Sequence, residues 1–263
     1  KVMQNTNTQF FTASRIAVIA MFATVAGVLY AFGFSMNFAF PFWLELNFSD
    51  IPALIGTFAL GPLSGGLIVF VKILIKLIIK GTSTIFVGEV TDLLVGLAFV
   101  VPAGLLYKKF RTFKGALAGM GVGTVCSVAL SILANWLVSV PFYLWLFFEN
   151  NWDGIIGPMQ LLFGDAVTRE TFYTYYLWAS VLPFNLMRCL IAVLVTLPVY
   201  KRISVLINRL NDKFAVKRAS ASANGDGTCG AVASKKRTLI LIGVCAGVVL
   251  LLVGGVPLRF FLS

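Results

Sequence analysis

The chain has 263 residues, of which 59% are hydrophobic and 12% are charged. Because a soluble domain carries about 25% charged residues, this composition excludes a water-soluble fold and indicates an integral membrane protein. The net charge of +11 does not favour a nucleic-acid partner, since the basic residues fall between the apolar runs, where they orient a chain in a lipid bilayer.

Six apolar runs are predicted to cross the membrane, because a spanning helix needs about 20 apolar residues. Their expected bounds are, in chain order, 16–34, 51–60, 63–79, 87–107, 115–148 and 175–200. Gly61-Pro62 should break the short second run, and Pro141 should bend or end the long fifth one near the outer surface. We expect residues 35–50 and 149–174 to be exposed loops.

The predicted fold class is an all-α integral membrane protein. Residues 1–212 would form a six-span substrate-binding domain, and residues 213–238, rich in Ala, Ser, Gly and charge, would form a cytoplasmic flexible linker. Residues 239–263 would add a seventh transmembrane helix, to which no role is assigned.

The basic residues predict the orientation of the chain. They gather at residues 108–114, between the fourth and fifth runs, and at 201–237, after the sixth. With six crossings these segments lie on one side, which the positive-inside rule assigns to the cytoplasm. We therefore expect a multi-pass protein of a prokaryotic plasma membrane with a cytoplasmic N-terminus.

Five ionisable residues lie inside the apolar runs, where such groups face a partner or a wet cavity. They are Lys72, Lys76, Glu89, Asp92 and Arg188. The third and fourth runs form a hairpin that puts Lys76 level with Glu89 and Lys72 level with Asp92, so two ion pairs are predicted. The alternatives are lysines that extend to the headgroups and direct contact of these residues with a substrate.

Polar residues also point to a binding pocket. In the fifth run, small residues recur at every fourth position and lead to an amide; they are Gly115, Gly119, Gly123, Ser127, Ser131 and Asn135. In the sixth run, Pro183 precedes Asn185, and Arg188 follows one turn later. Hydrogen bonds between helices are the simpler explanation for the two asparagines, whereas convergence at one depth favours a pocket.

Catalytic and cofactor signatures are missing from the sequence. It contains no G-x-x-x-x-G-K-[ST] loop, no histidine and no pattern of metal ligands, so we expect neither an enzyme nor a bound metal or cofactor. A pocket without an energy source implies a partner that supplies energy.

Several motifs together resemble one family. They are "FSDIPALIGTFALGPLSGG", Lys72, "GEVTDLLVGLAFVVPAGLLYKK", "LANWLVSVPFY" and "LPFNLMRC". In this order, over about residues 13–210, they resemble the riboflavin-specific substrate-binding (S) component of energy-coupling-factor (ECF) transporters. The resemblance implies a six-helix core that takes riboflavin from outside as its transported substrate. It also implies an energising module, made of a membrane coupling protein and two ATPase subunits.

The resemblance also implies roles for particular residues. Asn135, Asn185 and Arg188 match positions that face the flavin ring, whose pyrimidine edge an amide can bind. The family often has Lys at position 188 and Asn at position 92. Phe42 and Trp43 lie in the loop after the first run, which acts as a lid in the family, and aromatic rings can hold a flat heterocycle.

Further candidates carry alternatives. Ser49 or Asp50 would cap the second helix, or contact the ribityl hydroxyls instead. Lys72, Glu89 and Asp92 are further candidates for contact with the substrate. For the coupling-protein interface the resemblance implies the small residues Ala13, Ala17 and Ala20, continued by Ala23 and Gly27, whereas ordinary packing within the bundle is the alternative.

Two other functions stay open at this point. The same architecture could serve another vitamin or small molecule, since a fold does not dictate its ligand. A stand-alone secondary transporter with Glu89 and Asp92 as a proton site, or a polytopic enzyme, would belong to a different class. The lack of an inverted repeat and of a catalytic constellation counts against it.

Overall fold

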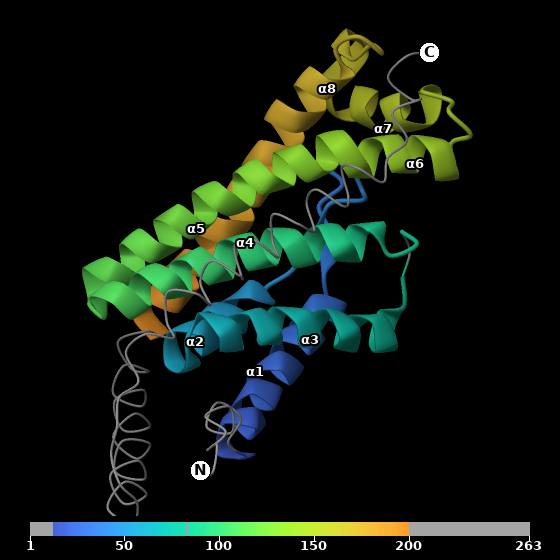
Figure 1. Ribbon diagram of the computed structural model, residues 1–263. Coiled ribbons are helices and arrows are strands. Elements are labelled where there is room, and N and C mark those ends of the chain that lie inside the picture. The colour runs from blue at the N-terminus through green and yellow to red at the C-terminus, as the bar shows by residue number, and fades with distance from the viewer. Residues whose placement is uncertain (1–12, 83, 200–263) are drawn as a thin grey trace, which may run out of the picture. The chain divides into compact units, whose positions relative to one another are not determined.

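The structure, a computed structural model, describes residues 13–82 and 84–199 (Figure 1). The predicted linker and seventh helix lie outside these residues. The first helices are α1 (Ala13–Ala31), α2 (Asp50–Leu60), α3 (Pro62–Lys80), α4 (Val87–Phe110) and α5 (Phe113–Ala134). They are followed by η1 (Asn135–Ser139), α6 (Val140–Phe147), α7 (Asp153–Phe163), η2 (Gly164–Ala166), α8 (Phe172–Thr174), η3 (Tyr175–Val181) and a helix over residues 182–199. The predicted all-α membrane fold is confirmed for this part of the chain.

The break between α2 and α3 falls where the sequence predicted it. Gly61 adopts φ 97°, a left-handed value that favours glycine, and Pro62 occupies the first position of α3, where no amide hydrogen is needed. A second glycine, Gly81 with φ 72°, ends α3. α2 is therefore a short helix of 11 residues rather than a full crossing.

The helices pack into one bundle around α3 and α4. α4 lies along α5 and α3, α1 packs on α3, and α2 fills the space between α1, α3 and α4 (Figure 1). The small residues of α5 allow this close approach, because a Cβ on Gly123 would clash with the carbonyl oxygen of Phe99. The four-residue series from Gly115 to Ser131 is buried, as close helix packing requires.

Pro141 does not end the fifth span, although the sequence left that possible. The apolar helix continues from Phe113 to Phe147. The chain changes helix type just before the proline, where residues 135–139 form the π-helix η1. A second π-helix, η3, lies directly upstream of Pro183, so each proline follows a short segment of wider helix that absorbs the irregular hydrogen bonding.

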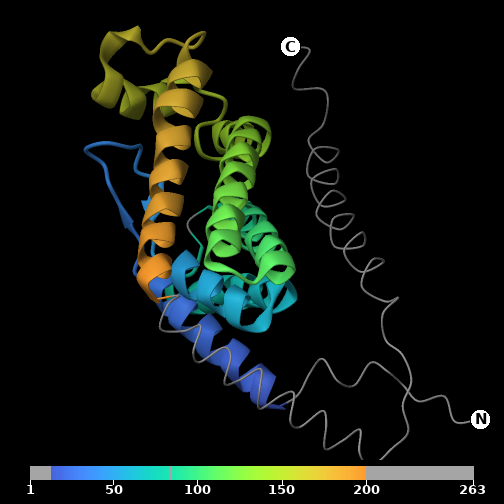
Figure 2. The same ribbon diagram turned by 90° about the vertical axis from the view of Figure 1, so that its left-hand side faces the viewer.

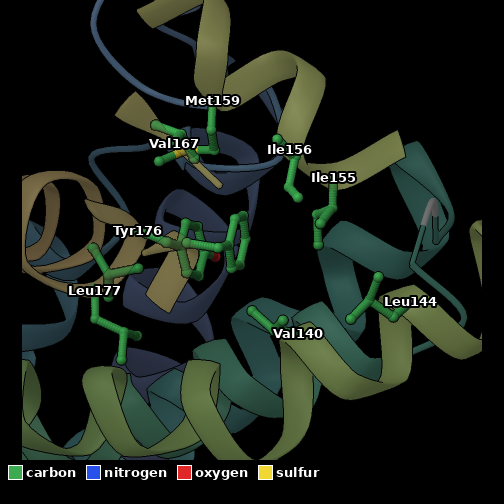
Figure 3. Packing of buried hydrophobic residues seen from close by; sticks show 10 residues of the cluster. Val140, Leu144, Ile155, Ile156, Met159, Val167, Tyr176 and Leu177 are labelled. Atoms are coloured by element: carbon green, nitrogen blue, oxygen red, sulfur yellow. The ribbon is translucent and has the colours of Figure 1, made fainter. Parts of the chain in front are cut away.

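The prediction of an exposed loop over residues 149–174 was wrong. This segment folds into α7, η2 and α8. One face of α7 carries Ile155, Ile156 and Met159, which pack with Val140 and Tyr176 in a buried apolar cluster (Figure 3). The spacing of these three apolar residues is that of a helix face, and Pro158 and the flanking glycines hid this pattern.

The loop after α1 contains a small β-hairpin. β1 (Phe34–Ser35) and β2 (Glu45–Leu46) pair antiparallel, with Phe34 opposite Leu46. The segment they enclose lies beside the helix of residues 182–199 (Figure 2), where the rings of Phe40 and Phe184 meet edge to face at 5.3 Å. We call residues 34–46 the hairpin loop.

Four of the described helices are long and apolar enough to cross a membrane. They are Pro62–Lys80, Val87–Phe110, Phe113–Phe147 and Phe172–Val199. Two shorter apolar helices, Arg15–Ala31 and Asp50–Leu60, stand where the first and second spans were predicted. The chain is thus a multi-pass membrane protein, whereas the count of six crossings plus a seventh stays a prediction.

Candidate functional site

A cavity of about 710 Å³ opens between the hairpin loop and the helices. Its walls come from α1, the hairpin loop, α3, α4, the α5–η1–α6 span and the helix of residues 182–199. Sites for small molecules measure about 300–1,000 Å³. The space therefore suits a ligand the size of a vitamin.

Most of the predicted site residues line this cavity. They are Phe42, Trp43, Glu89, Asp92, Asn135, Asn185 and Arg188. Three others, Ser49, Asp50 and Lys72, do not line it, because they are buried behind it in a network of charged groups. The prediction that these three contact the substrate directly is not supported by their position.

One of the two predicted ion pairs is confirmed. Lys76 Nζ lies 2.5 Å from Glu89 Oε1. The other carboxylate oxygen of Glu89 accepts hydrogen bonds from the hydroxyls of Thr82 and Thr84, each at 3.1 Å. The short connection between α3 and α4 brings these groups together, so matching depth along a hairpin was a sound guide here.

The predicted pair of Lys72 with Asp92 is wrong. Lys72 is 0% exposed, and its Nζ lies 2.7 Å from Asp50 Oδ1 and 2.7 Å from Ser49 Oγ. Asp92 instead accepts a hydrogen bond from Arg188 Nη1 at 2.5 Å. The prediction considered only the hairpin of α3 and α4, whereas α2 places a nearer carboxylate beside Lys72.

Asp50 links the two halves of this buried network. Its second oxygen, Oδ2, accepts a hydrogen bond from Arg188 Nε at 2.8 Å, so one carboxylate is shared by Lys72 and Arg188. Asp92 supplies the second negative charge. The two carboxylates therefore neutralise the two cations, Lys72 and Arg188. Such balance is needed because an unpaired charge in a protein interior is strongly destabilising.

The predicted capping role of Ser49 and Asp50 is also wrong. Ser49 stands at the N-cap of α2 without a side-chain capping bond, because its hydroxyl donates to Asn47 Oδ1 and accepts from Lys72. Asp50 is the first residue of α2, and its two carboxylate oxygens serve Lys72 and Arg188.

The two asparagines of the site have defined amide orientations. Asn135 Nδ2 donates to the carbonyl oxygen of Ser131 at 2.9 Å, and Asn185 Nδ2 donates to that of Val181, also at 2.9 Å. A carbonyl oxygen can only accept, so neither amide can be turned around without losing its bond. Asn185 thus keeps Oδ1 as an acceptor for a ligand, since no other described residue donates to it.

Arg188 keeps unused hydrogen-bonding capacity. Its Nη2 is buried and has no hydrogen-bond partner among the described residues, and the same holds for Asp92 Oδ2. Buried polar atoms without a partner are rare in native proteins and call for an explanation. A ligand in the adjoining cavity would supply one.

Aromatic side chains form the roof of the cavity. The rings of Phe42 and Trp43 meet edge to face at 4.9 Å, and the ring of Trp43 lies 6.1 Å from that of Tyr176. Sequence reasoning missed Tyr30, Tyr143 and Phe184, which also line the cavity. Their aromatic character alone did not distinguish them in a chain with 24 phenylalanines.

The small residues of α1 divide into two groups. Ala17 and Ala20 are exposed, whereas Ala23 is 0% exposed. A Cβ on Gly27 would lie 2.6 Å from Ile75. Ala23 and Gly27 therefore pack inside the bundle and do not continue an outer surface. The side chain of Ala13 lies outside the described part of the chain.

Comparison with known proteins places this architecture in a family. Residues 14–200 match the model for "ECF transporter, substrate-specific component". The riboflavin transporter FmnP of Bacillus subtilis (strain 168) is 28% identical over 185 residues, which cover 69% of this chain and 87% of that protein. The riboflavin transporter RibU of Staphylococcus aureus (strain TCH60) is 28% identical over 196 residues, covering 74% and 93%.

A solved structure supports the same assignment. That structure, reported as "Structure and mechanism of the S component of a bacterial ECF transporter", superposes with a TM-score of 0.54 at 26% identity. The match covers 74% of this chain and 97% of that one. The family model spans most of the chain, and the fold agrees with it. The chain therefore belongs to the family of substrate-specific components of ECF transporters.

Proposed function

We propose that this protein is the riboflavin-binding component of an ECF-type uptake transporter and captures riboflavin from the extracellular side. It would have no catalytic activity of its own. The observation that carries the proposal is the set of hydrogen-bonding atoms left for a ligand on three residues of one cavity, Asn135, Asn185 and Arg188.

These three residues complement the pyrimidine edge of a flavin. Asn135 Nδ2 donates to the Ser131 carbonyl at 2.9 Å and reaches Ser131 Oγ only at 3.5 Å, so a ligand can compete for its second N–H. Asn185 keeps an acceptor oxygen, and Arg188 keeps Nη2 as a donor. The flavin edge presents a carbonyl acceptor, an N–H donor and a second carbonyl acceptor. Two donors and one acceptor in the site match that set.

The charge of the cavity wall fits an uncharged ligand. Glu45 is paired with Lys80 at 2.9 Å, Glu89 with Lys76, and Asp92 with Arg188. Acidic and basic groups thus compensate each other across the site. Riboflavin is neutral and has a flat ring that the aromatic roof can cover.

The energising module would comprise a membrane coupling protein and two ATPase subunits. The chain itself has no phosphate-binding loop of the G-x-x-x-x-G-K-[ST] type. The exposed small surface of Ala17 and Ala20 on α1 would face the coupling protein. The basic segment at residues 108–114 would lie on the cytoplasmic side, with the N-terminus.

Equilibrium binding tests the proposal directly. Purified protein is titrated with riboflavin while the quenching of flavin fluorescence is followed, and thiamine serves as a ligand of unrelated shape. Saturable binding of riboflavin and none of thiamine is expected. Binding of thiamine, or of neither compound, would assign the cavity to another ligand.

A stand-alone, proton-coupled transporter is the second candidate. The geometry disfavours it, because Glu89 and Asp92 are the ion-pair partners of Lys76 and Arg188 in the cavity wall, where loss of a partner leaves a buried charge unpaired. Uptake of riboflavin in cells that lack every ECF energising module would support that candidate against our proposal.

A further inference from the structure

Two consecutive hydrogen bonds connect the hairpin loop to the site. The indole Nε1 of Trp43 donates to the hydroxyl oxygen of Tyr176 at 3.0 Å, and that hydroxyl donates to Asn135 Oδ1 at 2.8 Å. Trp43 and Asn135 line the cavity, whereas Tyr176 does not. Tyr176 therefore stands behind the site and joins two groups that a ligand can touch.

The direction of these bonds is fixed by chemistry. An indole N–H can only donate, so the tyrosine oxygen accepts it and turns its own proton toward Asn135. That proton requires the carbonyl oxygen of the amide. On the other side of Asn135, the carbonyl of Ser131 requires the amide nitrogen. Both partners thus select the same orientation of the side chain.

Tyr176 is held too firmly to follow a moving partner. It is 0% exposed and lies in the apolar cluster with Val140, Ile155 and Met159 (Figure 3). Its ring stacks on that of Phe172, with centroids 5.4 Å apart and an interplanar angle of 13°. Tyr176 is the second residue of the π-helix η3. The hydroxyl is therefore a fixed point for Asn135.

We propose that Tyr176 is a positioning residue that, together with Trp43, keeps the amide N–H of Asn135 directed at the ligand. The inference rests on the proposed riboflavin site and extends it. Because Trp43 belongs to the hairpin loop, the docking of that loop and the polarity of Asn135 are coupled. When the loop is displaced, the Tyr176 hydroxyl loses its donor and no longer has to donate to Asn135, so only the Ser131 carbonyl still selects the orientation of the amide.

Removal of the hydroxyl tests this role. Tyr176→Phe keeps the ring in the cluster and should weaken riboflavin binding about tenfold, the effect of losing the ordering hydrogen bond of a buried amide. Trp43→Phe should change the affinity in the same direction, since it deletes the donor. Tyr173→Phe is the matched control, because its ring also contacts Phe172, at 5.6 Å, outside the cavity.

A double-mutant cycle separates positioning from packing. In an Asn135→Ala background, Tyr176→Phe should cause no further loss of affinity, because its effect passes through the amide. A further tenfold loss in that background would overturn the inference and assign Tyr176 to packing alone. So would unchanged affinity of both Tyr176→Phe and Trp43→Phe. Thermal melting of each variant, compared with Tyr173→Phe, identifies a folding defect.

Different results would contradict the proposed function and the positioning role of Tyr176. If the unmodified protein shows no riboflavin binding, both the proposed function and the positioning role are overturned. If the unmodified protein binds riboflavin and Tyr176→Phe binds equally well, only the positioning role is lost.

Discussion

The carboxylate of Asp50 and the guanidinium of Arg188 meet at 2.8 Å, although 138 positions separate them in the sequence. This contact ties the start of α2 to the middle of the last described helix. Asp50 lies outside the cavity and pairs with Lys72 as well as with Arg188, whose side chain lines the cavity. A carboxylate behind the cavity therefore holds Arg188 in place. The binding site is thus supported by charges that no ligand reaches.

Asp50→Ala should therefore destabilise the protein strongly. The change leaves Lys72 buried without its carboxylate partner, and removal of one partner from a buried ion pair costs about 3–5 kcal/mol. Riboflavin binding should weaken as well, since Arg188 loses one of its two anchors. Thermal unfolding in detergent and ligand titration measure the two effects.

Glu45→Ala is the matched control for the stability measurement. Glu45 pairs with Lys80 at 2.9 Å, but the two side chains are 32% and 38% exposed. Exposed pairs contribute about 0.2–1 kcal/mol. An equal loss of stability in the two variants would contradict the structural role assigned to Asp50.

Asn185→Ala should weaken riboflavin binding at least about tenfold, because the ligand would lose an acceptor in a buried site. The side chain is buried against Val181, so the fold should tolerate the change with a modest drop in melting temperature. Asn151→Ala, at an exposed position, provides the comparison. Unchanged affinity of Asn185→Ala would remove this residue from the site.

Substitution of Asp92 distinguishes ECF-dependent uptake from proton-coupled transport. Asp92→Asn removes one negative charge from the buried network and should lower the melting temperature. It keeps an oxygen for Arg188 Nη1, so the folded protein should retain ECF-dependent riboflavin uptake within about threefold, the cost of weakening one charge-assisted hydrogen bond. A proton-coupled carrier would lose transport altogether. Radiolabelled riboflavin uptake, measured with and without the energising module, gives the answer.

Ala17→Trp should spare riboflavin binding and prevent assembly with the coupling protein. Ala17 is exposed on α1, where a bulky ring would separate two close helices. Val125→Trp places the same ring on another exposed position, on α5, and should assemble normally. Co-purification of Ala17→Trp in normal yield would move the interface elsewhere.

Gly123→Ala should destabilise the bundle by about 1–3 kcal/mol, the usual effect of overpacking. The new Cβ would meet the backbone of α4 at Phe99. Gly121→Ala adds the same methyl group where nothing lies within 4 Å, and higher helix propensity should stabilise it by up to about 1 kcal/mol. Melting temperatures of the two variants should therefore shift in opposite directions.

Local patterns in the sequence predicted the parts of the structure that depend on neighbouring segments. The break at Gly61-Pro62 follows from the conformations of two residues, and the pair of Lys76 with Glu89 follows from one short hairpin. The four-residue series on α5 indicated close helix packing and an amide directed into the bundle, and its residues, Asn135 included, are buried.

Relationships between distant segments could not be predicted in this way. Lys72 was assigned to the wrong carboxylate, because the position of Asp50 depends on how α2 sits in the bundle. The bond from Trp43 to Tyr176 joins residues 133 positions apart. α7 was taken for a loop because its apolar face extends over little more than one turn.

The two π-helices, η1 and η3, determine the direction in which the side chains that follow them point from the helix axis. A π-helix accommodates one extra residue in a helical turn, and each residue of an α-helix turns the chain by about 100°. Deleting one residue from η3, upstream of Asn185 and Arg188, would swing both side chains away from the cavity. An insertion or deletion of one residue there would therefore redirect the recognition of a ligand without altering any residue that contacts it.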